Sequence, residues 1–157
     1  MTENWTWGLA LIALTMTLHA VCVAFMALAH MKIQARLESR GGLGLWHGVA
    51  ILIGTIVTIG LLLAVLHGIE AALWAAAYVW LGALGSPEDA ILYSLDSITT
   101  RGASGVVLQQ HWRRTGALEA ADGMLLFGIS AAFIVAVMQR GLTDLYGVAQ
   151  ARQVARG

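Results

Sequence analysis

Three apolar stretches, each long enough to cross a lipid bilayer, constrain what this 157-residue chain can fold into. They run from Trp7 to Met31, from Trp46 to about Leu84, and from about Ala117 to Gln139. As a helix, about 20 apolar residues span the hydrocarbon core of a bilayer. Charged residues make up 11% of the chain, less than half the share found in soluble domains. The sequence therefore predicts an all-α membrane protein with three transmembrane helices.

The charges narrow the class of protein further. Nine basic and nine acidic residues give a net charge of zero, which argues against a nucleic-acid partner. The first apolar stretch has no basic residue before it, so we interpret it as a retained helix rather than a signal peptide. Basic residues gather in two places instead: Lys32, Arg36 and Arg40, and Arg140, Arg152 and Arg156. Cytoplasmic segments are enriched in Lys and Arg, so we expect the amino terminus outside and the carboxyl terminus in the cytoplasm.

A polar segment, Asp96 to Gly105, interrupts the apolar chain between the second and third stretches. Before it, Ser86 has the character of a helix N-cap and Pro87 suits the first helical position. The sequence predicts a short helix from Ser86 to about Thr99, after which the chain turns back. A bilayer tolerates non-helical backbone only where it lines a cavity or is buried in protein. This re-entrant segment is therefore the best candidate for a pore lining.

The residues around this segment resemble the tetrameric potassium-channel superfamily, in particular small bacterial ion channels with an extra amino-terminal helix. The resemblance covers roughly residues 60 to 140. It rests on the following features: ILYSLDSITTRGASG (Ile91–Gly105), His67-Gly-Ile-Glu70, Trp74, Tyr78, Trp112-Arg113, Glu119 and MLLFGISAAFIVAV (Met124–Val137).

The resemblance implies a homotetramer around an ion path, in a bacterial inner membrane, and not an enzyme. It divides the chain into an amino-terminal helix with a cytoplasmic connection (1–45), a pore domain (46–140) and a cytoplasmic tail (141–157). The pore domain would hold an outer helix, a pore helix, a filter and an inner helix. The expected partners are other copies of the chain, the lipid bilayer and inorganic ions.

The filter departs from the family ending, Thr-x-Gly-Tyr-Gly-Asp. The resemblance assigns the filter to Thr99, Thr100, Arg101, Gly102, Ala103, Ser104 and Gly105. Ala103 replaces the aromatic residue, and Ser104 replaces a glycine that adopts left-handed angles at small cost. We therefore expect a cation channel with weak or altered selectivity, in which potassium selectivity is lost. The alternative is a non-conducting, channel-like membrane scaffold or sensor.

Several charged residues are expected to support the filter. Arg101 is expected to pair with Asp96, which matches the family's acidic position behind the filter, and Glu70 is a second candidate partner. In the alternative, four Arg101 side chains line the pore and repel cations. His67 and Glu70 are three residues apart and share a helix face. They form either a structural pair behind the filter or a proton-sensitive gate.

The third apolar stretch carries two further candidates. Glu119 and Asp122 could form an acidic outer mouth, although a clamp on Arg113 and Arg114 is somewhat favoured. Gly128 is either a gating hinge or a packing residue.

A cofactor is not expected. His19 and His30 fall on one helical face, which would suit two haem groups, but matching histidines on another helix are missing from the sequence pattern. We predict neither a metal site nor a cofactor, apart from permeant monovalent cations.

Overall fold

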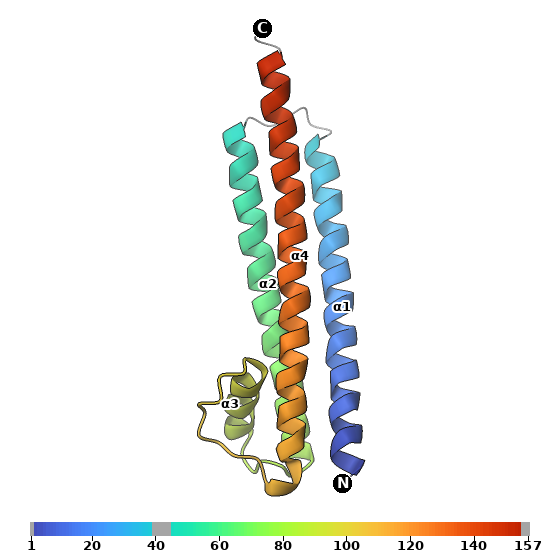
Figure 1. Cartoon of the computed structure of the whole chain (residues 1–157), viewed down its shortest axis with the longest axis vertical. Helices are drawn as coiled ribbons and strands as arrows, with labels where there is room; N and C mark the ends of the chain where they lie inside the picture. The colour runs from blue at the N-terminus through green and yellow to red at the C-terminus, as the bar shows by residue number, and fades with distance from the viewer. Residues whose placement is uncertain (1, 39–44, 155–157) are drawn as a thin grey trace. The chain divides into compact units, whose positions relative to one another are not determined.

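A computed structural model describes residues 2–38 and 45–154, and the described residues contain helices and no strand. The elements are α1 (Thr2–Glu38), α2 (Leu45–Trp80), α3 (Pro87–Ile98), the short 3-10 helix η1 (Gln110–Trp112) and α4 (Arg113–Val154) (Figure 1). The three long helices are each long and apolar enough to cross a membrane. The prediction of an all-helical, multi-pass membrane protein is thereby confirmed.

Two helix boundaries differ from the expected ones. The second helix ends at Trp80 rather than near Leu84, because Gly82 adopts a φ of +67° and the amide of Ala83 bonds to the carbonyl of Tyr78 over 2.8 Å. This is a Schellman motif, which ends a helix at a left-handed residue. The last helix starts at Arg113 rather than near Ala117 and continues unbroken to Val154, so residues 141–154 of the expected tail are helical.

The chain forms two compact units. Unit 1 consists of the residues up to Val21 together with Ala64–Ile129. It therefore contains the first part of α1, the last part of α2, all of α3, and the start of α4. Its main core is formed by Trp74, Ala75, Tyr78, Ala83, Leu84, Ala90, Leu108 and Trp112.

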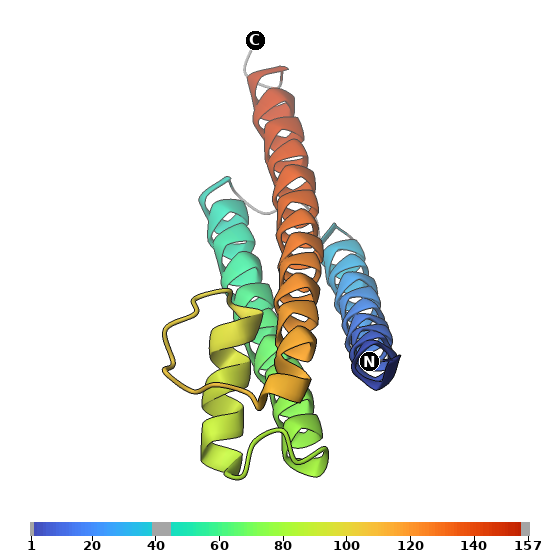
Figure 2. The ribbon, with the colours of Figure 1, turned by 60° about the horizontal axis from the view of Figure 1, so that its bottom comes forward.

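Within unit 1, α3 lies beside the end of α2 and the start of α4 (Figures 1 and 2). The Ser86 side chain accepts a hydrogen bond from the amide of Asp89, and Pro87 occupies the first helical position, as the sequence predicts. Two glycines of α4 allow the close approach of α3. A Cβ atom at Gly123 would overlap the carbonyl of Ile98, and one at Gly116 would overlap the hydroxyl of Tyr93.

Unit 2 consists of Cys22–Leu63 and the chain from Ser130 onward. Here glycines again mark close packing between helices: Gly48 of α2 faces Leu145, and Gly141 of α4 faces Leu52. The polar residues of the predicted filter and its supports all belong to unit 1, so the candidate site lies there.

Candidate functional site

The Asp96 carboxylate organises the segment that follows α3. Its Oδ1 atom accepts hydrogen bonds from the Arg101 Nε (2.7 Å) and from the Ala103 amide (3.0 Å), and its Oδ2 accepts one from the Ser104 amide (3.0 Å). The Arg101 guanidinium, followed by these amides, holds the pKa of the Asp96 carboxyl below its usual value. Asp96 therefore stays ionised at neutral pH and holds the segment in a defined shape.

The expected pairing of Arg101 with Asp96 is thus confirmed. The prediction of Glu70 as a second candidate partner of Arg101 was wrong, because both oxygens of Glu70 are bound by histidines. The Arg101 side chain nevertheless remains 61% exposed. The ion pair holds one nitrogen of the guanidinium group, Nε, while most of the side chain remains exposed.

The backbone of this segment has an unusual conformation. Thr100, Gly102 and Gly105 have positive φ angles of 55°, 66° and 73°. Ser104 is not among the left-handed residues, which fits the expectation that a serine resists that conformation. A non-glycine residue at positive φ is uncommon, and such strain persists only where the surroundings hold it. At Thr100, the hydrogen bonds from the neighbouring amides of residues 101, 103 and 104 to Asp96 stabilise this conformation.

The carbonyl groups of residues 100–105 are the second notable feature of the segment. None of the hydrogen bonds among the described residues ends on these oxygens, although three amides of the same segment are bound to Asp96. An open groove of about 400 Å³ runs beside the segment. Its lining comprises Tyr93, Asp96, Ser97, Thr100, Gly102, Ser104, Gly105, Val106, Val107 and Ala120.

Glu119 of α4 is fully buried and faces the interior of unit 1. Tyr78 of α2 donates a hydrogen bond to its Oε2 over 2.7 Å, and Ser94 of α3 donates one to its Oε1. The same Ser94 hydroxyl lies 2.7 Å from the carbonyl of Ala71. Glu119 therefore ties together α2, α3 and α4.

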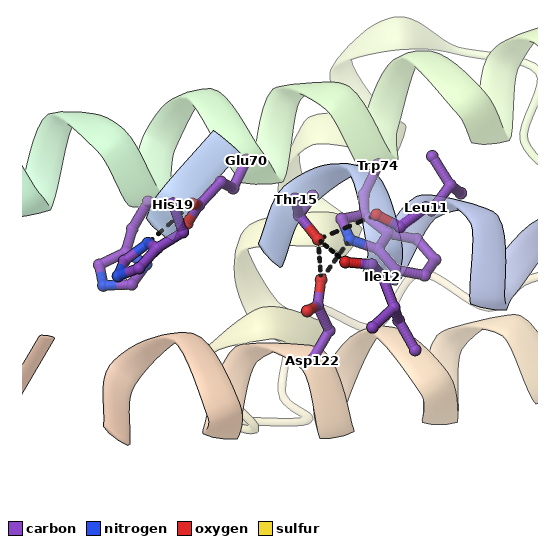
Figure 3. Close-up of polar contacts among 8 residues, drawn as sticks. Leu11, Ile12, Thr15, His19, Glu70, Trp74 and Asp122 are labelled. Carbon is purple, nitrogen blue, oxygen red and sulfur yellow. Dashed lines mark hydrogen bonds and ion pairs between the residues drawn. The ribbon is translucent and has the colours of Figure 1, made fainter. Parts of the chain in front are cut away.

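Asp122, one turn further along α4, is also fully buried. Its Oδ2 accepts hydrogen bonds from the Thr15 hydroxyl (2.6 Å) and from the Trp74 indole (3.0 Å), as Figure 3 shows. This carboxylate joins α4 to both α1 and α2. Thr15 was not singled out in the sequence, because it is 107 residues away from its partner.

Both predictions for these two acidic residues were therefore wrong. Buried carboxylates that face the inside of a helix bundle cannot form an acidic mouth. They do not clamp Arg113 and Arg114 either, since both arginines are exposed and the carboxylates bind neutral donors. The physical reason is desolvation: an intramembrane carboxylate requires hydrogen-bond donors, and the hydroxyl and indole groups of neighbouring helices supply them.

His67 and Glu70 do form the expected pair, with His67 Nδ1 3.0 Å from Glu70 Oε2. A third residue joins them from α1: His19 Nδ1 lies 2.9 Å from Glu70 Oε1 (Figure 3). His19 and Glu70 are fully buried, and the Phe127 ring stacks on His67 with a centroid distance of 4.1 Å. Glu70 thus connects α2 to α1 rather than to residues 99–105, the predicted filter.

The cluster of His19, His67 and Glu70 is the feature that sequence reasoning missed. One ligand atom from each residue lies within 4.8 Å of the other two, a spacing that could hold a metal ion. The only sequence signal was a histidine in the apolar interior of the first helix. That signal gives no partner, because 51 residues separate His19 from Glu70.

Gly128 lies in a continuous part of α4, and a Cβ atom there would meet nothing within 4 Å. Packing within one chain therefore does not explain this glycine, and its role as a hinge stays a prediction.

Comparison of the chain with protein-family models, with curated proteins and with solved structures finds no match. The fold and the site by themselves define a multi-pass helical membrane protein. Its polar, non-helical segment is anchored by one buried carboxylate.

Proposed function

We propose that four copies of this chain bring residues 99–105 together around a common axis and form a cation channel with weak or altered selectivity. One observation carries this proposal. The amides of Arg101, Ala103 and Ser104 are bound to Asp96, whereas the carbonyls of residues 100–105 accept none of the described hydrogen bonds. Unpaired carbonyls cannot face hydrocarbon, so they require water, an ion or another protein surface. A water-filled path between four copies meets that requirement.

In the proposed channel, carbonyl oxygens replace part of the hydration shell of a passing cation. The carboxyl end of α3 immediately precedes the segment and contributes the partial negative charge of a helix terminus. Asp96 is the residue that keeps the segment in shape from behind. Three differences from the family explain weak selectivity: the charge at Arg101, the missing ring at Ala103, and the side chain at Ser104.

The surface of unit 1 near the segment is compatible with assembly or with lipid. Unit 1 has exposed apolar side chains on α3, on α4 and just after the polar segment: Leu92, Leu95, Val107, Met124, Leu125 and Phe127. The proposal also includes the orientation expected from the basic residues, with an external amino terminus. Arg40 and Arg156, two of those residues, lie outside the described part of the chain.

A non-conducting scaffold or sensor is the second candidate, and the exposure of Arg101 favours it. Four guanidinium groups near one axis would repel cations even if each is paired with Asp96. The Arg101→Gln variant separates the two candidates. Under the channel proposal, both proteins conduct and the variant conducts more; under the scaffold alternative, the wild type does not conduct.

The decisive experiment is cation flux from liposomes that contain the purified full-length protein. We expect sodium and potassium to be released at comparable rates, and reversal potentials in planar bilayers to give a permeability ratio near one. Native mass spectrometry of the same preparation should give a tetramer. The Gly147→Ala variant provides a control for assembly, because this position lies outside the expected pore domain, is exposed and has no neighbour within 4 Å.

Three results would contradict all or part of the proposal. A monomer or dimer, in both detergent and membranes, would exclude the common axis. A tetramer without flux for any monovalent cation would support the scaffold instead. A potassium permeability far above that of sodium would keep the channel but refute the altered selectivity.

A further inference from the structure

We propose that His19, His67 and Glu70 form a binding site for a divalent transition-metal ion of the zinc class. This site is separate from the filter segment, and its existence does not depend on conduction. It would join α1 to α2 within unit 1.

The geometry suits a metal ion. The two imidazole Nδ1 atoms lie 2.9 and 3.0 Å from different oxygens of the Glu70 carboxylate. Zinc bonds to nitrogen and oxygen of about 2.0–2.1 Å in a tetrahedral site place neighbouring ligand atoms about 3.3 Å apart. The two nitrogen–oxygen separations need to change by only a few tenths of an ångström, and the three ligand atoms all lie within 4.8 Å of one another.

The ligand chemistry selects the class of metal. Imidazole nitrogen is a good ligand for zinc, copper, iron and nickel, whereas calcium and magnesium prefer oxygen alone. Two imidazoles with one carboxylate provide three ligands. On binding, each imidazole carries its proton on Nε2, and the Nδ1 lone pair faces the metal.

The charge balance of unit 1 also favours a cation. Glu70, Glu119 and Asp122 are all fully buried carboxyl groups. The sequence has no Lys or Arg before residue 32 or between residues 41 and 100, so neither the first part of α1 nor any of α2 supplies a permanent positive charge. A divalent ion held by Glu70 would offset this excess of acidic groups.

Access and rigidity are consistent with such a site. His67 has 11% of its side-chain surface accessible, while the side chains of His19 and Glu70 are completely covered. A metal ion would therefore enter past His67, and a water molecule could complete its coordination there. The stacked Phe127 ring holds the His67 imidazole in a fixed plane.

The test is zinc binding to the full-length protein, purified without a histidine tag and stripped with a chelator. We expect one Zn²⁺ per chain by mass spectrometry of metal content. Binding should weaken at least about tenfold in the His19→Ala, His67→Ala and Glu70→Gln variants, since even outer partners of metal sites change affinity by that much. Glu70→Gln is nearly isosteric, so it tests the site if a truncated variant fails to fold.

Matched controls come from the other histidines. His47→Ala and His111→Ala remove exposed imidazoles, and His30→Ala removes a buried one in unit 2. All three should bind zinc as the wild type does. Cobalt(II) in the wild type should give visible bands of a nitrogen and oxygen site, without the thiolate charge-transfer band that Cys22 would add.

Two outcomes would overturn the proposal. One is the absence of saturable zinc binding to folded wild-type protein. The other is binding that survives Glu70→Gln unchanged or disappears with the histidine controls. Neither outcome bears on ion flux, which is measured separately.

Discussion

At the scale of single residues, the interior of unit 1 contains acidic groups that a membrane protein ordinarily avoids. The burial of Glu119 and Asp122 is tolerated because each side chain receives two hydrogen bonds from neutral donors on neighbouring helices. An intramembrane carboxyl group without such donors would cost several kcal/mol. The hydrogen bonds of Glu119 and Asp122 therefore connect α4 to the neighbouring helices.

The Tyr78→Phe variant tests this role. It removes one of the two donors to Glu119 and leaves the ring in place, so we expect a loss of about 1–3 kcal/mol in the free energy of unfolding. The measurement is denaturation of the purified protein in mixed detergent micelles. Tyr146→Phe is the matched control, because Tyr146 is 73% exposed and should tolerate the change. Equal stability of the two variants would contradict the proposed role of Glu119.

The Asp96→Asn variant tests the anchor of residues 99–105, the predicted filter. We expect lower tetramer stability at neutral pH, because an amide cannot replace the charged acceptor of Arg101 and two amides. The pKa of Asp96 lies below its usual value of 3.8 in the folded protein. Its stabilisation is therefore complete above pH 3.8 and is lost as the pH falls through the folded pKa.

Thermal midpoints measured across pH should show this dependence. The gap between the wild type and Asp96→Asn should be constant from neutral pH down to about 4 and should narrow below it. A gap that instead closes near neutral pH would mean that another group, such as a histidine, dominates.

At the scale of elements, the docking of α3 on α4 depends on small residues at the contact. Gly123 leaves room for the end of α3, since a side-chain carbon would overlap the Ile98 carbonyl. Ser97 adds a hydrogen bond of 3.0 Å to the Gly116 carbonyl. This contact sets the position from which residues 99–105, the predicted filter, start.

The Gly123→Ala variant should therefore displace α3. We expect a loss of about 1–3 kcal/mol in stability, as for other overpacked contacts, together with reduced ion flux. Gly128→Ala, five residues further along the same helix, should be neutral or slightly stabilising, because alanine favours helix over glycine. The two variants are compared by denaturation and by liposome flux. A large loss of flux in stable Gly128→Ala protein would instead establish the hinge.

At the scale of the whole molecule, the proposed function depends on how four copies of the chain would assemble around one axis.

The resemblance to potassium channels offers a gain-of-function test. Ala103→Tyr, Ser104→Gly and Gly105→Asp together rebuild the family ending, Thr-x-Gly-Tyr-Gly-Asp. If residues 100–105 form the filter, this triple variant should raise the potassium-to-sodium permeability ratio measured from reversal potentials. Arg101→Gln added to the triple variant would show whether the remaining charge limits conduction. A conducting triple variant with an unchanged ratio would place the filter elsewhere.

Local sequence patterns determined much of this protein. Hydropathy alone predicts the three long helices, and Ser86 with Pro87 predicts the start of α3. The pair of Arg101 and Asp96 was predicted from the resemblance to potassium channels, which implies an acidic residue behind the filter, and the two partners are five residues apart. Each of these features depends on neighbours in the chain, so no knowledge of helix packing is needed.

Only the tertiary structure decided the partners of Glu70, Glu119 and Asp122. Helices that are apolar on all sides do not reveal which face meets which neighbour. The rotation and register of α1 against α2 bring His19 to Glu70 and create the proposed metal site. The rotation of α4 likewise turns its two acidic residues inward, away from the surface where their sequence position had suggested a mouth. These choices follow from the packing of whole helices, which residue patterns within one helix do not specify.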